Sequence, residues 1–248
     1  MIKFFRKIRQ NLLMENNTGK YLKYAIGEIF LVVFGILIAL QINNWNEQVK
    51  GQRVANSYIK SLQADLENDV KALDNLIGGF EMELAKNLAL AKRLSSPTAN
   101  TDTIKKIARY EFLPYFNPTN ELNLSTFNAL IATGHIDLLQ RDFAKKIQEH
   151  NAFQLFVLKG SEFNIKLAAD VGKDYIQKYP LNSPQNAING QIMDSFWDQT
   201  DDNQLKIELN AVLTSKIFVL EVVNEVRKEL LKRTKKLILE IEDKSKDD

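Results

Sequence analysis

Glu28 is the residue of this sequence whose surroundings most suggest a chemical role. It is a carboxylate inside the run AIGEIFLVVFGILIALQI, residues 25–42, in which Gln41 is the only other polar side chain. A charged group is costly in the hydrocarbon of a membrane, so a carboxylate there is treated first as a functional residue. Three interpretations stay open: Glu28 pairs with a cation or polar group of a partner helix, it is protonated in a proton-linked complex, or it reaches the cytoplasmic headgroups and pairs with Lys23 or Lys20.

The remaining residue types that perform catalysis do not form a recognisable pattern. His135 and His150 are fifteen positions apart without an H-E-x-x-H spacing, and the chain has no cysteine, no G-x-S-x-G, no P-loop and no G-x-G-x-x-G. Four acidic residues near the last helix lack the alternating ligands, central glycine and terminal glutamate of a calcium loop, and helix capping explains them, with Asp202 as the expected cap: Asp194, Asp198, Asp201 and Asp202. We therefore expect no catalytic residue, no cofactor and no metal ion, and no enzyme activity.

Residues 25–42 have the length and composition of a membrane span. As a helix they would extend about 27 Å, close to the hydrocarbon thickness of a bilayer. A cleaved signal peptide would need a small-residue cleavage site, which Ala39-Leu40-Gln41 fits poorly. A buried core helix would have an amphipathic stripe, whereas residues 29–40 are apolar on all sides. The sequence thus predicts one transmembrane helix in contact with the lipid bilayer.

The charges beside this span predict its orientation. Residues 1–24 carry a net charge of +5 and the remaining 224 residues carry −3. Basic residues next to a span remain on the cytoplasmic side, so residues 1–24 are expected to form a basic cytoplasmic amphipathic tail on the inner membrane. Residues 43–248 would then lie in the periplasm, where nucleic acid is not an expected partner. Lys20 and Lys23 would anchor the inner interface, and Trp45 the outer one.

One face of the predicted span is small and polar. At 100° per residue, Tyr24, Glu28, Gly35 and Ala39 fall close to one line along the helix. Gly35 and Ala39 form a small-xxx-small pair, which allows another helix to approach closely. We therefore expect this face to mediate helix association, either in a homo-oligomer or with a multi-span membrane protein.

The N-terminal region also carries a family resemblance. Its most specific pieces are Gly19-Lys20-Tyr21, the segment YAIGE at residues 24–28, and the segment QINNWN at residues 41–46. Residues 1–47 resemble the N-terminal signature of a large family of uncharacterised single-span membrane proteins from Bacteroidetes-type bacteria, catalogued as a domain of unknown function. A looser second match includes Thr126, Phe127, Leu130, Gly134, Ile136, Leu138 and Leu139. The resemblance implies an integral membrane protein with an extracytoplasmic helical domain and no assigned activity.

After the span, apolar residues recur at the three- and four-residue steps of amphipathic helices. The pattern predicts long helices over residues 48–94, 142–179 and 204–242, and short ones near residues 103–110 and 125–133, the latter stopped by Gly134. The expected fold class is all-α, with one N-terminal transmembrane helix continuing into an elongated antiparallel helical bundle. On the first long helix, Gln63, Asp65, Glu67, Asp69 and Lys71 are expected to face solvent.

Inward positions are predicted for the second long helix, and a linker follows it. The expected inward residues are Phe143, Ile147, Phe153, Phe156 or Val157, Phe163, Leu167, Val171 and Tyr175. Residues 180–203 are expected to be a polar linker that docks through Phe196 and Trp197. A basic run on the last helix either meets anionic headgroups or forms a solvated face balanced by glutamates: Arg227, Lys228, Lys232, Arg233, Lys235 and Lys236.

Aromatic residues and prolines cluster between the first and second long helices. Tyr110, Phe112, Tyr115 and Phe116 lie close to Pro114 and Pro118. Such a cluster forms either the mouth of a ligand site or a plug at the end of a helical bundle, and the sequence does not separate these.

Three functions remain consistent with these residues. The first is a non-catalytic envelope scaffold or adaptor that acts through helix–helix association. The second is a periplasmic sensory domain that binds a small ligand among the aromatic residues and signals through a membrane partner. The third is an accessory subunit of a proton-linked complex that uses Glu28.

Overall fold

The computed structural model describes residues 18–116, 122–184 and 186–247, and it describes the backbone alone at residues 18, 20, 21, 24 and 244–247. The predicted cytoplasmic tail therefore lies largely outside the described residues. The chain divides into two compact units, residues 1–57 and residues 58–248, and each is described by itself below.

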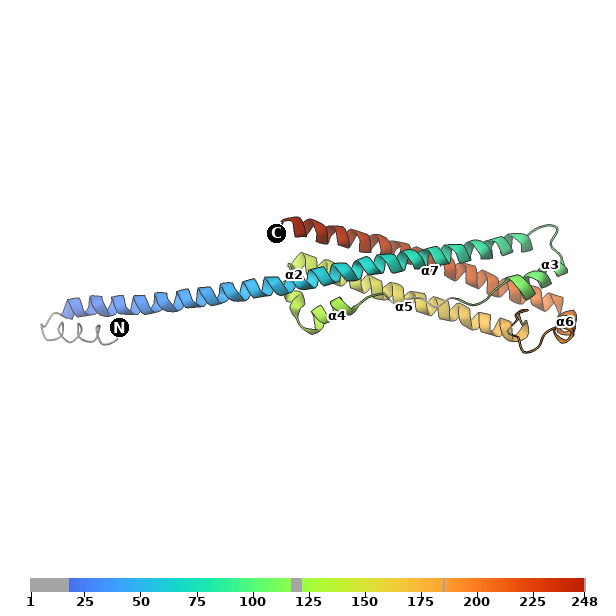
Figure 1. The fold of residues 1–248 in the computed structure, drawn as a ribbon, viewed down its shortest axis with the longest axis horizontal. Helices are drawn as coiled ribbons and strands as arrows, with labels where there is room; N and C mark the ends of the chain where they lie inside the picture. The colour runs from blue at the N-terminus through green and yellow to red at the C-terminus, as the bar shows by residue number, and fades with distance from the viewer. Residues whose placement is uncertain (1–17, 117–121, 185, 248) are drawn as a thin grey trace. The chain divides into compact units, whose positions relative to one another are not determined.

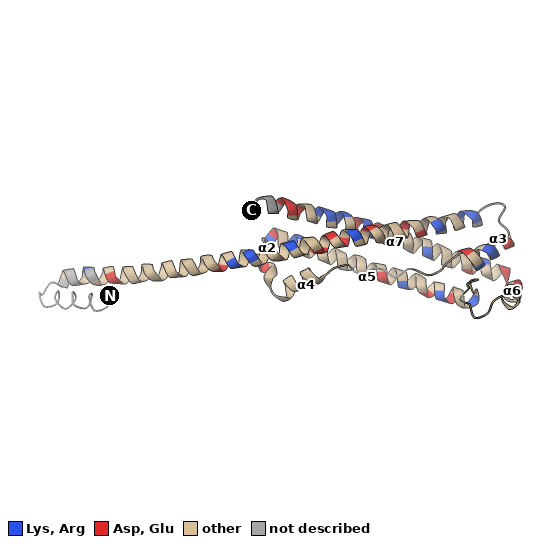
Figure 2. Ribbon diagram, in the orientation of Figure 1, with Lys and Arg blue, Asp and Glu red and all other residues tan. Residues whose placement is uncertain are grey.

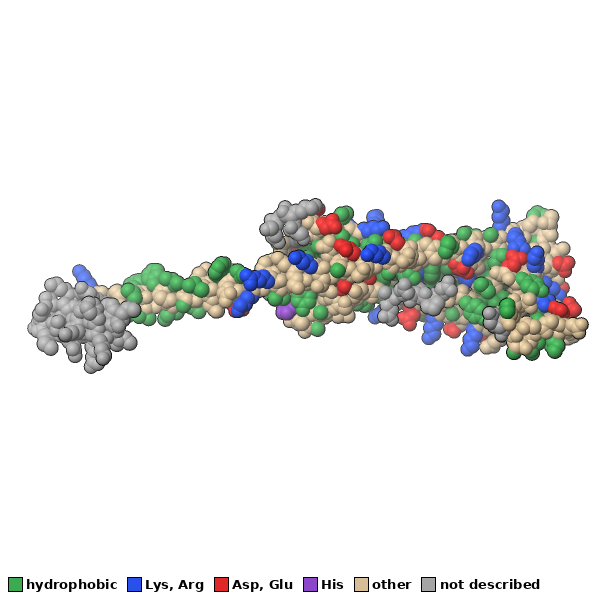
Figure 3. All heavy atoms as spheres, in the orientation of Figure 1, with side chains coloured by type: hydrophobic (Ala, Val, Ile, Leu, Met, Phe, Trp, Pro, Cys, Tyr) green, Lys and Arg blue, Asp and Glu red, His purple; other side chains and the backbone are tan. Residues whose placement is uncertain are grey.

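Helix α2 (Thr18–Leu94) contains no proline and continues without interruption past the apolar stretch, as expected. In the first unit the large apolar side chains from Ile29 to Ile42 are 44–70% exposed (Figure 3). Among the described residues this is the one helix that is long and apolar enough to cross a membrane, and its most apolar window has a mean hydropathy of 2.4 with none of it buried. The described part of the protein leaves this apolar surface uncovered.

The second unit is built from three long helices: residues 58–94 of α2, α5 (Arg141–Lys178) and α7 (Asp202–Asp247) (Figure 1). Ion pairs between the helices show in which direction each helix runs. Helices α5 and α7 are joined by Lys146–Glu240 and Lys178–Glu208. Helices α7 and α2 are joined by Lys216–Glu83 and Lys235–Asp74. Residue numbers rise on one helix while they fall on the other, so α7 runs antiparallel to both of its neighbours. The predicted all-α fold class is confirmed, and these helices form an antiparallel bundle. Six of the lysine and arginine residues of α7 lie between residues 227 and 236 (Figure 2).

Amphipathic stripes explain why these helices pack together. On α2 the buried side chains follow the three- and four-residue steps of one helix face: Leu62, Leu66, Leu73, Ile77 and Phe80. Asp69 is 3% exposed and lies on this same stripe, so its predicted position facing solvent is wrong.

On α5 the inward face is only partly the predicted one. Phe143, Ile147, Val157 and Tyr175 are buried, as expected. Of the two alternatives Phe156 and Val157, it is Val157 that faces inward, and Phe156 is exposed. The side chains of Phe163, Leu167 and Val171 are also exposed, so the inward prediction is wrong at these three positions. The buried face of α5 instead includes polar and small residues, namely Asn151, Gln154, Ser161, Ala168 and Gly172.

Short elements connect α2 to α5. Helix α3 (Thr101–Lys106) begins with a capping box between Asn100 and Thr103, and the π-helical turn η1 (Ile107–Glu111) follows it directly. The chain then has no regular secondary structure from Phe112, whose backbone is extended, to Phe116, and this stretch is called the extended segment below. Helix α4 (Ser125–Ala132) ends before Gly134, whose φ of 70° is the left-handed conformation expected for a helix stop. The 3₁₀ turn η2 (His135–Leu138) leads into α5.

The predicted linker between α5 and α7 contains a helix. Helix α6 (Gln191–Asp198) buries Trp197, whose side chain is 2% exposed, whereas Phe196 is 43% exposed. The docking prediction therefore holds for the tryptophan alone. The cap of α7 is Asp201, whose Oδ1 accepts from the backbone N–H of Asn203 at 2.8 Å. Asp202 was the expected cap, but it forms an ion pair with Lys105 at 3.0 Å instead.

Candidate ligand-binding site

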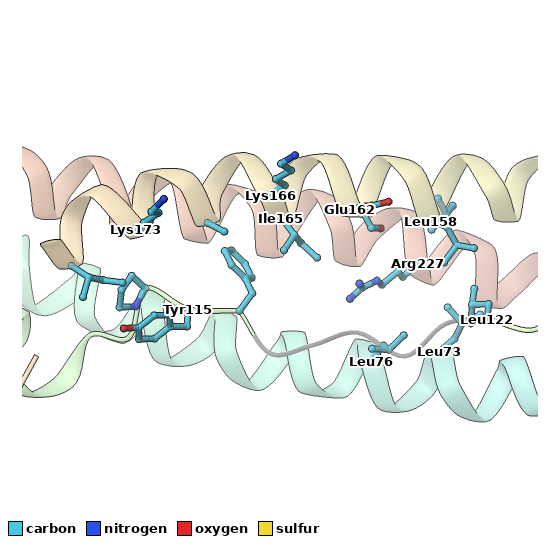
Figure 4. Close-up of a pocket in the computed structure, with 17 residues that line it drawn as sticks. Leu73, Leu76, Tyr115, Leu122, Leu158, Glu162, Ile165, Lys166, Lys173 and Arg227 are labelled. Carbon is cyan, nitrogen blue, oxygen red and sulfur yellow. The ribbon is translucent and has the colours of Figure 1, made fainter. Parts of the chain in front are cut away.

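A cavity of about 540 Å³ lies inside the second unit, between α2, α5, α7 and the extended segment (Figure 4). Its walls are mainly apolar, with Leu73, Leu76, Leu122, Val157, Leu158, Ile165 and Ile176 among the side chains that form them. Binding sites for small molecules are commonly concave, mostly apolar and of about 300–1,000 Å³, with a few polar groups that orient the ligand. This cavity has both properties.

Arg227 of α7 is a positively charged group in the wall of this cavity (Figure 4). Its side chain lies over the ring of Phe80, with the guanidinium carbon 4.2 Å from the ring centroid, and the residue is 4% exposed. The Nη1 atom has no hydrogen-bond partner among the described residues. Burial lowers the pKa of Arg227 to about 10, so the group is still charged at neutral pH.

Ser161 of α5 supplies a second unpaired polar atom to the same cavity. The residue is 6% exposed, and its Oγ atom also lacks a hydrogen-bond partner in the part of the chain that the structure describes. A buried hydroxyl at an inward helix position commonly bonds to the carbonyl one turn earlier. Two residues that line the cavity, Arg227 and Ser161, therefore each have one buried polar atom without a hydrogen-bond partner among the described residues.

The rim of the cavity carries three further charged residues, all on α5. Glu162, Lys166 and Lys173 line it and are exposed to solvent (Figure 4). Glu162 makes no ion pair with Arg227 within the described ranges. With Arg227 included, the lining residues carry more positive than negative charge.

Lys216 of α7 holds the extended segment in place against the bundle. The residue is 1% exposed, and its Nζ donates to the carbonyl oxygens of Leu113 and Tyr115, the latter at 3.0 Å. It also forms an ion pair with Glu83 of α2 at 2.7 Å. One buried ammonium group thus connects α7, α2 and the segment that forms one wall of the cavity.

The charges of this pair stabilise each other. Burial lowers the pKa of Lys216, and the hydrogen bond and negative charge of Glu83 act in the opposite direction. Burial by itself would raise the pKa of Glu83, but the hydrogen bond and positive charge of Lys216 lower it below its ordinary value. Lys216 is therefore a fully paired buried cation, in contrast to Arg227.

The extended segment also lies close to the backbone of α5. A Cβ atom added at Gly172 would be 3.0 Å from the carbonyl oxygen of Pro114 and 3.3 Å from its Cβ. The absence of a side chain at this position permits the close approach of helix and segment.

A polar network fixes the chain where it enters α4. Asp69 accepts from the backbone N–H of Asn123 at 2.7 Å and from the side-chain amide of Gln154 at 2.9 Å. Asp65 accepts from the side chain of Asn123 at 2.6 Å and from the backbone N–H of Thr126 at 3.2 Å. Two carboxylates of α2 therefore satisfy donors at the start of α4, where a negative charge is favourable.

Burial raises the pKa of Asp69 to about 6. The hydrogen bonds from Asn123 and Gln154 lower this pKa, and the negative charge of Asp65 raises it by a smaller amount. The carboxyl group is thus more easily protonated in the folded protein than in the unfolded chain.

The four predicted aromatic residues occupy three different environments. Tyr115 and Phe116 line the cavity. Phe112 is fully buried and packs edge-on against Tyr175 at 5.8 Å between centroids, in a core cluster that also contains Trp197. Tyr110 is 54% exposed, with the guanidinium of Arg109 at 5.0 Å from its ring centroid. Phe112 is thus part of the bundle core, whereas Tyr115 and Phe116 lie at a cavity.

The predicted membrane residues lie in the first unit. Gly35 and Ala39 are on an exposed surface, and a Cβ atom added at Gly35 would meet nothing within 4 Å. Trp45 is 65% exposed, Lys23 is exposed and Glu28 is half-buried. The side chains of Tyr24 and Lys20 lie outside the described residues.

Metal ligands do not converge in the described part of the chain, where no group of three His, Asp or Glu side chains could hold an ion. His150 is instead a buried imidazole without a hydrogen-bond partner in that same part. Burial, together with the charge of Arg233, lowers its pKa to about 4.

Sequence reasoning missed Arg227, Lys216 and Ser161 as site residues. Arg227 was assigned to a basic run that was expected to face headgroups or solvent, and its burial shows that both interpretations are wrong for this residue. A signal was available in the spacing, because residues 216 and 227 are four residues before and seven after Leu220, on the apolar stripe of α7.

Comparison with known proteins gives one match. Residues 28–112 match the model of a family described as a family of unknown function (DUF6090). No curated protein and no solved structure matches the chain. The matched range contains residues 28–47 of the N-terminal signature together with the bundle part of α2, α3 and η1. Over this range the chain is thus similar to a family of unknown function, which agrees with that part of the predicted resemblance, and the looser second match at residues 126–139 lies outside the matched range.

Proposed function

We propose that this chain is a membrane-anchored sensory protein whose helical domain binds a small molecule with a mainly apolar body. The observation that carries the proposal is the cavity of about 540 Å³, which has apolar walls and two unpaired polar groups. Folded proteins rarely keep buried polar atoms without partners, and a bound molecule would supply those partners.

The membrane part of the proposal rests on residues 25–42. Their exposed apolar side chains would face lipid, and the charge asymmetry supports an orientation with residues 1–24 in the cytoplasm and residues 43–248 in the periplasm. The resemblance of residues 1–47 supports a Gram-negative bacterium of the Bacteroidetes type as the source. Lys23 and Trp45 would mark the two interfaces of the inner membrane.

A sensory role is supported by the elements that form the cavity walls. A ligand would contact α2, α5, α7 and the extended segment at once. A ligand shifts a conformational equilibrium only through contacts that differ between two states, and a molecule bound among four packed segments has many such contacts. Helix α2 also contains residues 25–42, so a partner that binds the span would respond to a change in this helix.

The test is photoaffinity labelling of the full chain in lipid nanodiscs. The probe is 1-decanol with a diazirine on its alkyl chain, and labelled peptides are identified by mass spectrometry. We expect labels on residues 114–116 and 158–176, and their loss in Ala169→Trp, which fills the cavity. The matched control is Ala211→Trp on α7, an exposed position outside the cavity lining. Labelling confined to residues 25–42 in every variant would refute the ligand site.

A second candidate function is association with a second copy of the chain, as expected for a scaffold. It is favoured by the exposed apolar side chains of the bundle, which include Phe156, Phe163 and Leu167 on α5 and Phe218 on α7. The mass of the protein in nanodiscs tests this candidate, with a dimer expected for the natural chain and a monomer for Phe163→Glu.

A photoreactive residue in place of Ile36 tests whether the span takes part in association. A self-adduct that is lost in Gly35→Leu supports association through Gly35 and Ala39. An adduct with a multi-span protein, in place of the self-adduct, would show that the span associates with that protein and not with a second copy of the chain.

A further inference from the structure

Arg227 has the environment of an anion-binding group rather than of a structural one. A structural buried arginine is normally paired with a carboxylate or with several carbonyl oxygens. Lys216 on the same helix meets this expectation, with one carboxylate and two carbonyl oxygens as acceptors. Arg227 has only the face of Phe80 as a favourable partner in the described structure, and a cation–π contact offsets a small part of the cost of burying a charge.

We propose that the cavity selects amphiphiles with a carboxylate headgroup, and that Arg227 and Ser161 bind this headgroup while the apolar walls bind the chain. The inference rests on the proposed ligand-binding function and names the class of ligand.

The chemistry of the two unpaired groups supports a carboxylate. A guanidinium donates two parallel hydrogen bonds to the two oxygens of one carboxylate, and this arrangement is stronger than bonds to a neutral acceptor. The O–H group of Ser161 donates a further hydrogen bond to a carboxylate oxygen, which accepts it at a lone pair that the guanidinium leaves free. A neutral headgroup such as a hydroxyl would satisfy one donor but would leave the charge of Arg227 uncompensated.

The other charged groups that face the cavity act in the same direction. Lys166 and Lys173 at its rim are cations, and Glu162, the one acid among the lining residues that the structure describes, is exposed to solvent and therefore screened. An anionic headgroup is attracted by this rim, whereas a cationic amphiphile meets Arg227 in a buried and unscreened position.

The experiment measures competition for the diazirine probe by three molecules that share a ten-carbon chain. Decanoate, 1-decanol and decyltrimethylammonium are titrated against the full chain in nanodiscs, each corrected for its measured partitioning into protein-free nanodiscs. We expect decanoate to compete at least about tenfold more strongly than 1-decanol, as a charge-assisted pair in a buried site requires, and decyltrimethylammonium to compete least.

Variants assign the preference to Arg227. Arg227→Met is expected to reduce the preference for decanoate to less than about threefold while the decanol probe still labels the cavity, and Ser161→Ala to reduce it partly. The matched control is Arg233→Met, which removes another arginine of α7 that is stacked on a phenylalanine, at 3.9 Å, but does not line the cavity. A structural role makes a different prediction, because Arg227→Met would then lower the melting temperature of the ligand-free protein. We expect that temperature to rise, since the variant removes an unpaired buried charge.

The outcomes separate the two proposals. If all three molecules compete equally at the cavity, or if Arg227→Met keeps the preference for decanoate, the carboxylate inference is wrong and ligand binding still holds. If no probe labels residues 114–116 or 158–176, the proposed function is wrong, and the inference about the headgroup is wrong with it.

Discussion

Replacement of Lys216 by methionine removes the group that ties the extended segment to the bundle. The ammonium is 1% exposed and makes three hydrogen bonds, two to carbonyl oxygens of the segment and one to Glu83. Loss of one partner of a buried ion pair costs about 3–5 kcal/mol. The Glu83 side chain is 29% exposed, so water solvates it in the variant, and we expect the low end of this range, about 3 kcal/mol.

The free energy of unfolding is measured by thermal denaturation of the full chain in nanodiscs, followed by circular dichroism at 222 nm. In a domain of this size a loss of 1 kcal/mol lowers the melting temperature by about 2–4 °C, so Lys216→Met should lower it by about 6–12 °C. The control is Lys206→Met on the exposed side of α7, which should change the stability by less than about 0.5 kcal/mol. A decrease below 1 kcal/mol for Lys216→Met would refute the assignment of this lysine as the anchor of the segment.

Three further predictions concern buried groups near the bundle core. The pKa of Asp69 is raised to about 6 in the folded state, so its contribution to stability is present at pH 4 and is lost as the pH rises through 6. Relative to Asp69→Asn, the natural chain should lose up to about 3 kcal/mol of its free energy of unfolding over this pH range, measured by urea denaturation. Parallel plots of the free energy of unfolding against pH for the two proteins would contradict this. The pKa of His150 is lowered to about 4, so stability is lost as the pH falls from 6.5 through 4, and His150→Leu should abolish that loss in the same measurement. Gly172→Ala should cost about 1–2 kcal/mol, because its Cβ would be 3.0 Å from the carbonyl oxygen of Pro114, and an unchanged melting temperature would show that the segment moves freely.

The helices themselves were predictable because their signals are local. Apolar spacing identified α2, α5 and α7 to within a few residues at their bundle ends, and Gly134 marked the end of α4. The continuation of α2 past residue 42 was expected because no proline lies near the boundary. Each of these features depends on neighbours within one or two helical turns.

The site was less predictable because it depends on which helices pack against each other through their apolar stripes. Asp69, Lys216 and Arg227 all occupy stripe positions on their helices, where a charged residue interrupts the pattern. Their polarity suggested solvent, yet their spacing placed them inside. Partners distant in the sequence decide between the two, since the atoms that surround Lys216 come from α2 and from the extended segment.

The same limitation explains the errors on α5. Phe163 and Leu167 are large and apolar, and hydrophobicity alone assigns them to the core. The face that packs in the bundle instead carries Ser161, Ala168 and Gly172, and at Gly172 the extended segment comes so close that an added Cβ atom would be 3.0 Å from the carbonyl oxygen of Pro114. Close approach favours small residues, which a search for large apolar side chains does not detect.

Native mass spectrometry of the full chain, purified from the membranes of the cells that express it, tests whether the cavity is a ligand site. We expect one additional mass per chain, which corresponds to a small carboxylate amphiphile and is absent from Ala169→Trp. The same bare mass for the natural chain and for Ala169→Trp, with decanoate also failing to add to either, would contradict the claim that the cavity is a ligand site.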